Sequence, residues 1–307
     1  MSRTARSWPK SVDAILGALW GIISAGVGLL PWLMAGARLP LQNLWATETM
    51  PEDMPIALLP VSQYSVILIL AMFVSGAVIA ALGVRNFFGA RRRPATAFTV
   101  AGLALVQLVA VVQAFSVVSV GLAPGRASTM YLTGLLAAAV ISAAVGLLIF
   151  MMLLGKHRWL PTVGFALAAV PLASWVVEWM VQLSPRTIEG PFSTSMVYRW
   201  LPAILVGVSL AWCGLKPAAL ALVWVANLAF LWAIPALVTA TQSTLGTRNQ
   251  LGDFEAMGEI AVAVLKGALG PAGGAIYTVL LALGIAVAGL LLQRFVPTFR
   301  GNTRTSR

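Results

Sequence analysis

The alternation of apolar and polar stretches divides the chain into eight long apolar segments joined by shorter polar connections. A helix that crosses about 30 Å of hydrocarbon needs about 20 consecutive apolar residues, and each segment meets that length. The sequence therefore predicts an all-α, polytopic bundle in a single membrane domain. The eight predicted spans are 12–34, 64–84, 97–120, 132–154, 160–181, 196–215, 217–239 and 275–295.

The sixth and seventh segments are the hardest to separate, because only Gly214–Pro217 lies between them. Arg199 and Pro202 also stand in the first turns of the sixth segment. Together the two segments run for more than 40 residues, which is too long for one crossing of a bilayer. We therefore expect two helices with a tight turn between them.

Composition supports a membrane environment, because 60% of the 307 residues are hydrophobic and only 9% are charged. Ordinary soluble domains have about 45–50% apolar and about 25% charged residues. This excludes a soluble enzyme, a nucleic-acid-binding domain and a disordered chain. The net charge of +11 comes from bases in short loops, so we expect the lipid bilayer as a partner and no nucleic acid.

The basic residues also predict the orientation, because cytoplasmic loops of membrane proteins are enriched in Lys and Arg. With both termini cytoplasmic, fourteen of the twenty bases lie inside. The inner bases are Arg3, Arg6, Lys10, Arg85, Arg91, Arg92, Arg93, Lys156, Arg158, Lys216, Arg294, Arg300, Arg304 and Arg307. The outer bases are Arg38, Arg126, Arg186, Arg199, Arg248 and Lys266. Of the nine acids, only Asp13 would lie inside.

The first segment has a basic start and a possible cleavage site at Ala35–Ala37, so it could be a signal peptide. Its apolar core exceeds 20 residues, however, whereas the core of a signal peptide has about 7–15. We therefore expect it to remain as a span. Sixteen of the twenty bases are arginine, which is typical of a GC-rich bacterium and favours a bacterial plasma membrane.

The third long outer connection predicts an amphipathic helix over 251–268. Asp253 is suited to cap its start. Its apolar face carries Phe254, Met257, Ala261, Val264, Leu265 and Ala268. Glu255, Glu259 and Lys266 fall on the opposite face. We expect this helix to lie on the outer membrane surface or cover the bundle, or else to pack as an element leading into the eighth span.

Charge within a span is the best indicator of a functional site in such a protein. Glu178 is the one acid well inside a predicted span, and Arg199 begins the next span at the same level. The two are predicted to form an ion pair, either at the mouth of a pathway or as a structural feature. Asn227, on the seventh span, is a further candidate for lining that pathway, although an amide also serves helix packing.

Other polar and small residues point first to packing between helices. Gln107 and Gln113 on the third span either join neighbouring helices or line a hydrated path. Small residues recur every four positions in the first and fourth spans, where they allow close backbone contact. Among them the helix-packing candidates are Gly17, Gly21, Gly134 and Gly146.

Chemical motifs are scarce. Glu48, Glu52 and Asp53 in the first outer loop could bind a metal or act as a base, but a solvated acidic loop is the simpler interpretation. A single cysteine, Cys213, excludes an internal disulfide, and a single histidine, His157, excludes a histidine-rich metal centre. The sequence shows no cofactor, metal or catalytic motif.

Three functions remain open. Pro171 and Pro235 interrupt spans, and broken helices build binding sites in transporters, which favours a small transporter or permease-like protein. The alternative is a non-catalytic subunit or scaffold that binds another membrane or envelope protein, or a second copy of itself. The third is a membrane-embedded enzyme that acts on lipid.

Overall fold

The computed structural model describes residues 10–88, 92–183, 193–247, 253–270 and 273–295. Within this part of the chain the secondary structure is helical, with two isolated β-bridges and no strand. The α-helices are α1 (Lys10–Met34), α2 (Val66–Phe87), α3 (Arg92–Gly121), α4 (Arg126–Leu153), α5 (Trp159–Leu183), α6 (Thr194–Cys213), α7 (Leu220–Gly246), α8 (Phe254–Leu269) and α9 (Ala275–Phe295). A short 3-10 helix, η1 (Pro51–Asp53), lies between α1 and α2.

All of the described helices except α8 and η1 are long and apolar enough to cross a membrane, which makes eight. The prediction of a multi-pass, all-helical membrane protein is therefore confirmed. The boundaries differ most at α4, which begins at Arg126, and at α7, which continues to Gly246. Both extensions consist mainly of polar residues. Hydropathy predicts only the apolar part of a span, whereas the helix itself can continue beyond it.

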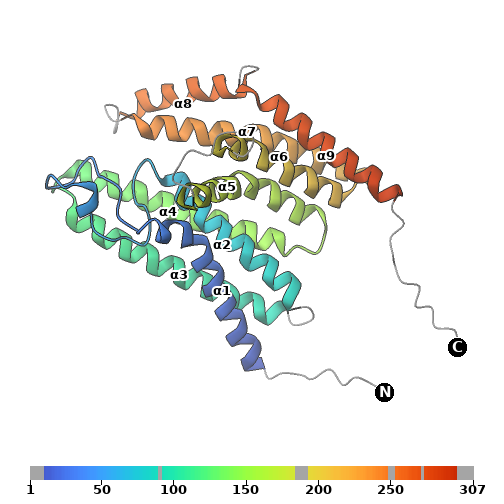
Figure 1. Cartoon of the computed structure of the whole chain (residues 1–307), viewed down its shortest axis with the longest axis horizontal. Helices are drawn as coiled ribbons and strands as arrows, with labels where there is room; N and C mark the ends of the chain where they lie inside the picture. The colour runs from blue at the N-terminus through green and yellow to red at the C-terminus, as the bar shows by residue number, and fades with distance from the viewer. Residues whose placement is uncertain (1–9, 89–91, 184–192, 248–252, 271–272, 296–307) are drawn as a thin grey trace.

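The helices form a bundle in which α2 and α5 occupy the middle (Figure 1). In the first half of the chain, α1 packs on α3 and α2 packs on α4. In the second half, α5 packs on α7 and α6 packs on α9. Contacts of α2 and α4 with α5 join the halves, so that each half forms a packing unit along one continuous bundle.

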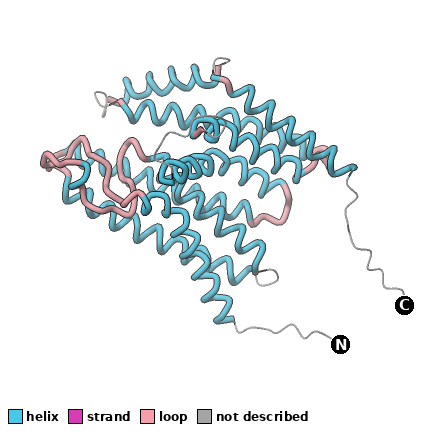
Figure 2. Tube along the Cα trace, in the orientation of Figure 1, coloured by secondary structure: helices cyan, strands magenta, loops and turns pink. Residues whose placement is uncertain are grey.

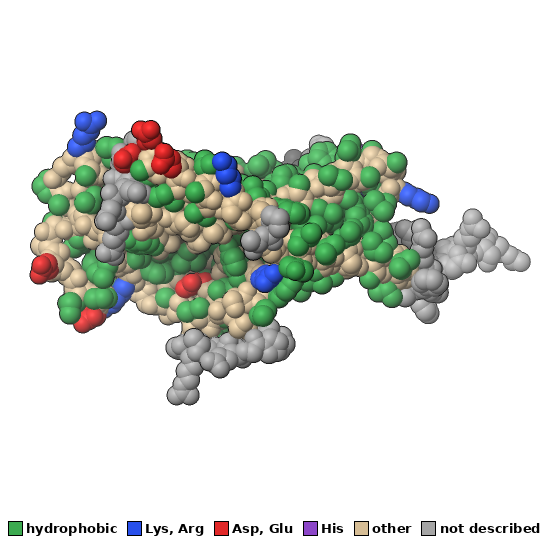
Figure 3. All heavy atoms as spheres, turned by 90° about the horizontal axis from the view of Figure 1, so that it is seen from above, with side chains coloured by type: hydrophobic (Ala, Val, Ile, Leu, Met, Phe, Trp, Pro, Cys, Tyr) green, Lys and Arg blue, Asp and Glu red, His purple; other side chains and the backbone are tan. Residues whose placement is uncertain are grey.

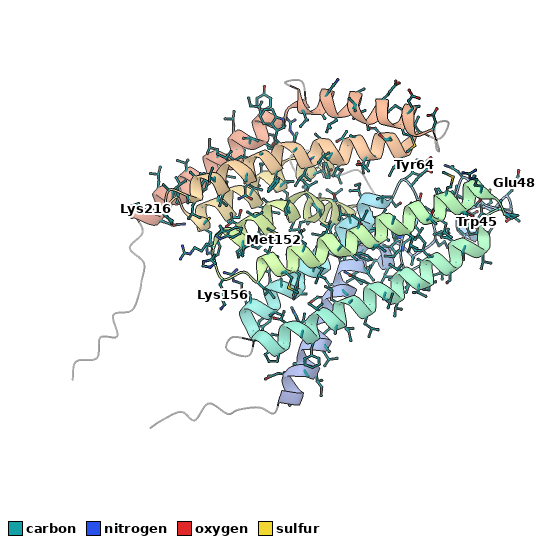
Figure 4. All side chains as sticks on the ribbon, turned by 180° about the vertical axis from the view of Figure 1, so that it is seen from behind. Trp45, Glu48, Tyr64, Met152, Lys156 and Lys216 are labelled. Carbon is teal, nitrogen blue, oxygen red and sulfur yellow. The ribbon has the colours of Figure 1, made fainter. Side chains whose placement is uncertain are left out.

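The two ends of the bundle differ in character. Figure 4 shows Lys156 and Lys216 at one end, called here the basic end, and Trp45, Glu48 and Tyr64 at the opposite, loop end. The start of α1 and the end of α9 lie toward the basic end (Figure 1). Eight of the bases used to predict orientation lie outside the described residues: Arg3, Arg6, Arg91, Arg186, Arg248, Arg300, Arg304 and Arg307. The assignment of the basic end to the cytoplasm stays a prediction.

Hydrophobic side chains cover most of the surface between these ends. Figure 3 shows a broad green band, with charged side chains to either side of it on the face in view. α9 contributes strongly to such a surface, because only 17% of its most apolar 18-residue stretch is buried inside the protein. A lipid environment accounts for so much exposed apolar surface, because it is the solvent in which that surface carries no cost.

The connection 35–65 between α1 and α2 lies at the loop end and is folded into the bundle (Figure 2). Leu39, Met54, Leu59 and Val61 are almost fully buried and join a core with residues of α2, α3 and α4. The loop pairs with the end of α3 and the residues just after it, since Ala46 donates its backbone N–H to the carbonyl of Gly121 at 2.9 Å and Ala123 donates to that of Leu44 at 2.8 Å. This loop is therefore part of the protein interior.

A helix, α8, covers Phe254–Leu269, and Asp253 caps it by accepting from the backbone N–H of Glu255 and Ala256, both at 3.2 Å; its place at the outer membrane surface stays a prediction. Positions 251 and 252 and the side chain of Phe254 lie outside the described residues. α8 packs along the second half of α7, with Glu255 and Glu259 exposed. It thus precedes α9 as an element attached to the bundle.

Candidate binding pocket between α8 and α9

A cavity of about 240 Å³ lies where α8 ends and α9 begins. Its walls come from five helices: Val170 on α5, Tyr198 to Pro202 on α6, Leu231 to Thr239 on α7, Ala268 on α8 and the first turn of α9. Its lining residues run from Val170 to Thr278, and among the described residues none comes from α1–α4.

The helix break that opens this cavity follows from the local sequence. Gly270 stands at the C-cap of α8, and Gly274, with φ of 70°, occupies a conformation that favours glycine. The end of α8 is fixed to α7, because the indole N–H of Trp232 donates to the carbonyl of Leu269 at 3.1 Å. The chain then turns into α9, whose first residue, Ala275, lines the cavity.

Two prolines interrupt the helical hydrogen bonding beside the cavity. A proline inside a helix has no N–H for the carbonyl four residues earlier. Pro202 in α6 and Pro235 in α7 therefore remove the helical donors for the carbonyls of Tyr198 and Leu231. All four of these residues line the cavity. Most of the other lining side chains are apolar; the hydroxyl of Thr239 donates to the carbonyl of Pro235 at 2.9 Å, and that of Thr278 donates to the carbonyl of Ala275 at 2.7 Å.

Arg199 is the charged residue among those that line the cavity. Its guanidinium carbon lies 4.9 Å from the ring centre of Trp200 and 6.0 Å from that of Tyr277 on α9. A Cβ added to Gly274 would stand 2.9 Å from one of its terminal nitrogens, so Arg199 reaches the helix break. The start of a helix also favours negative charge. The arrangement is suited to an anionic group.

The other two predicted pathway residues do not line this cavity. The carboxylate of Glu178 accepts from the side-chain amide of Gln182, one turn away, at 2.8 Å. Among the described residues no ion pair joins Glu178 to Arg199, whose guanidinium faces aromatic rings. Asn227 is fully buried and donates to the carbonyl of Val223 at 2.8 Å, while its side-chain oxygen has no partner.

The predicted packing glycines differ in what surrounds them. A Cβ on Gly17 would lie 2.9 Å from the carbonyl oxygen of Ala95, and one on Gly21 would meet the carbonyl oxygen of Thr99, both on α3. A Cβ on Gly146 would lie 3.2 Å from a backbone oxygen of α2. Gly134 has open space at that position. The close approach of α1 to α3 thus depends on the first two.

Gln113 has a structural role that neither predicted alternative included. Its side-chain oxygen accepts from the backbone N–H of Leu58 at 2.8 Å, and its side-chain nitrogen donates to the carbonyl of Ile56 at 3.0 Å. It therefore holds the loop 35–65 as a neighbouring strand would. The sequence signal that this loop is buried was the apolar run 55–61, because a loop exposed to water is usually polar.

The acidic loop residues are exposed. Glu48 borders a wide depression of about 620 Å³ at the loop end, together with Trp45 and Asn43. Glu52 and Asp53 lie on η1 and are also exposed. In the described part of the chain, no three His, Cys, Asp or Glu side chains are grouped as they would be to hold a metal ion.

Comparison with known proteins adds no assignment. No protein-family model matches this chain, and neither a curated protein nor a solved structure matches it.

Proposed function

We propose that this protein is a small transporter or permease-like protein whose substrate binds between α8 and α9. The observation that carries the proposal is an apolar cavity with one guanidinium, that of Arg199, at a break between two helices. Transporters commonly bind substrates at broken helices, where a helix start faces an anionic group. The predicted orientation supports access to this pocket from the outer side of a bacterial plasma membrane.

The chemistry of the walls supports a small anion with an apolar body. Arg199 supplies charge and several N–H donors for a carboxylate or phosphate. Leu231, Pro235 and Ala236 supply apolar surface for the rest of the molecule. Drug-sized ligands occupy pockets of about 300–1,000 Å³, so a cavity of about 240 Å³ fits a smaller organic acid.

The binding test uses the purified full chain in detergent and a series of straight-chain carboxylates and phosphate monoesters. We expect some members to raise the melting temperature of the wild type. Arg199→Gln should weaken the apparent affinity about tenfold or more, because a charge-assisted hydrogen bond is lost. Arg126→Gln is the matched control, since Arg126 is an exposed arginine at the start of α4, away from the pocket.

A second variant fills the cavity with a larger side chain and leaves the charge of Arg199 unchanged. Ala268→Phe places a ring in the cavity and should abolish the thermal shift. Uptake of the best ligand into proteoliposomes then tests transport, with empty liposomes as the blank. Binding without uptake by the wild type would contradict transport while leaving the pocket in place. Equal shifts for wild type, Arg199→Gln and Ala268→Phe would contradict the pocket itself.

A second candidate function is a membrane scaffold, and the folded loop 35–65 is the observation that favours it. This loop presents a wide depression near Glu48 on a rigid base, as a recognition surface requires. Purification in mild detergent should then retain a partner with wild type and Arg199→Gln, and lose it when Glu48 and Asn43 are replaced by alanine. Loss of the partner only with Arg199→Gln would contradict the scaffold.

A further inference from the structure

At the basic end, two arginines from separate elements meet over one tryptophan ring. The guanidinium carbon of Arg85, in the last turn of α2, lies 5.2 Å from the ring centre of Trp212 on α6. That of Arg158, in the connection between α4 and α5, lies 5.6 Å from the same centre. This group is called here the arginine clamp. It shares no residue with the lining of the proposed pocket.

Each part of the clamp is held in place by the fold. Arg85 donates to the carbonyl of Leu153, at the end of α4, at 3.2 Å. Arg158 lies just before α5, and its side chain is exposed. Trp212 lies in the last turns of α6, and α6 packs on α5. The clamp therefore lies where the ends of α2, α4 and α6 meet the start of α5.

The clamp carries two positive charges, and no acid in the described part of the chain balances them. Among the described residues neither Arg85 nor Arg158 has an ion pair with a carboxylate. Lys156 lies two residues from Arg158, and Lys216 lies at the same end of the bundle (Figure 4). Bringing like charges together is unfavourable unless an anion or water compensates, so the charge pattern favours an anionic ligand.

An apolar track on α6 leads away from the clamp. Ile204, Val208 and Trp212 are each separated by four residues, so they share one face of α6. All three are exposed, with 43%, 55% and 40% of their surface accessible. This face can lie along an acyl chain. A ligand that fits both features has an anionic head and a hydrocarbon tail.

We propose that the arginine clamp binds the phosphate of an anionic phospholipid in the surrounding bilayer. Arginine is suited to this because its planar guanidinium donates two parallel hydrogen bonds to phosphate oxygens. The indole of Trp212 keeps both guanidinium groups at the level where apolar surface ends. Basic sites between helices at a membrane surface are general binding sites for such headgroups.

The test measures binding of single phospholipids to the purified full chain by native mass spectrometry. We expect the wild type to bind phosphatidylglycerol more tightly than phosphatidylcholine. Arg85→Gln with Arg158→Gln should weaken phosphatidylglycerol binding about ten- to thirtyfold, while phosphatidylcholine binding stays the same. Arg126→Gln with Lys266→Gln is the control, because it removes the same charge from exposed positions away from the clamp.

A single variant and a competition with phosphate complete the test. Arg158→Gln alone, which leaves the hydrogen bond of Arg85 in place, should weaken binding about fivefold and serves if the double variant does not fold. Inorganic phosphate at millimolar concentration should not displace the lipid; displacement would point to a free phosphate site and overturn the proposal. Equal weakening in the control variant would show a general effect of charge, and unchanged binding in the clamp variants would exclude the site.

Discussion

Both halves of this protein contain irregular backbone between helices, and they treat it differently. In the first half, the loop 35–65 enters the bundle, and many of its polar groups are paired, although the buried side-chain oxygen of Gln63 has no partner. The indole N–H of Trp32 donates to the carbonyl of Ala57 at 2.9 Å, and the amide of Gln42 donates to that of Val61 at 2.8 Å. In the second half, the connection of α8 to α9 leaves a cavity with a guanidinium in it.

The difference shows how one physical requirement leads to two results. Backbone groups removed from water must be paired by the protein or by a ligand. Filling the space with leucines and amides produces a rigid core, as around Leu59. Leaving the space open, with prolines that free carbonyls and a cation at the edge, produces a site that a ligand can complete. The first half of the bundle therefore has a filled core where the second half has an open cavity.

The largest expected effect tests whether the loop 35–65 is truly interior. Leu59→Ala removes a fully buried side chain and should cost about 2–5 kcal/mol of stability, because the cavity left behind is only partly closed. Leu265→Ala, on the half-buried face of α8, should cost clearly less. Thermal unfolding of both variants in the same detergent gives the comparison. Equal losses would remove the distinction between the two regions.

The next prediction concerns the close packing within the first half. Gly21→Ala should cost about 3 kcal/mol, near the upper end for overpacking, because the new methyl group meets backbone atoms of α3 that cannot move freely. Gly134→Ala should be nearly neutral, since open space surrounds that position. Unfolding temperatures of the two variants test this. A larger loss at Gly134 would contradict the arrangement of α1 against α3.

A smaller effect is expected from the amide that holds the loop. Gln113→Leu keeps the size of the side chain but removes both hydrogen bonds to Ile56 and Leu58, and should cost about 1–2 kcal/mol. Hydrogen exchange should then increase in 55–61 more than elsewhere. Gln242→Leu, on the exposed side of α7, is the control. Unchanged exchange in 55–61 would show that Gln113 does not hold the loop.

The smallest expected effect is the coupling energy between Glu178 and Arg199, the two residues that the sequence predicts to form an ion pair. Their side chains have separate partners, so a double-mutant cycle with Glu178→Gln and Arg199→Gln should give a coupling below about 0.5 kcal/mol. Arg199→Gln should still impair ligand binding, whereas Glu178→Gln should not. A coupling above about 1 kcal/mol would restore the ion pair and extend the site toward α5.

Much of the fold was predictable because it depends on short stretches of chain. Each span is specified by its own apolar composition, and α8 by the spacing of Met257, Ala261 and Val264 and by the cap at Asp253. The ends of α4 and α7 were harder to predict, because helices continue through polar residues once they have left the hydrocarbon. The prediction of Arg199 as a site residue rested on the rarity of charge in spans.

The rest depended on residues far apart in the chain. Gln113 meets Ile56 and Leu58 from more than fifty positions away, and Gln63 donates to the carbonyl of Leu245 across 182 positions, at 2.9 Å. No local pattern contains such pairs. Likewise Arg199 had a plausible partner in the preceding span, but it lies against the start of α9.

Sequence alone thus determined how many helices the chain can place in a membrane and where they lie, because transfer of each segment into hydrocarbon is a local sum over its residues. Tertiary structure alone decided which helices touch, that the loop containing Leu59 is buried, and that the break at Gly274 opens a cavity beside Arg199. The physical reason is that lipid and neighbouring helices are similarly apolar, so hydrophobicity does not choose between packing partners. Close backbone contact at Gly21 and hydrogen bonds such as those of Gln113 make that choice.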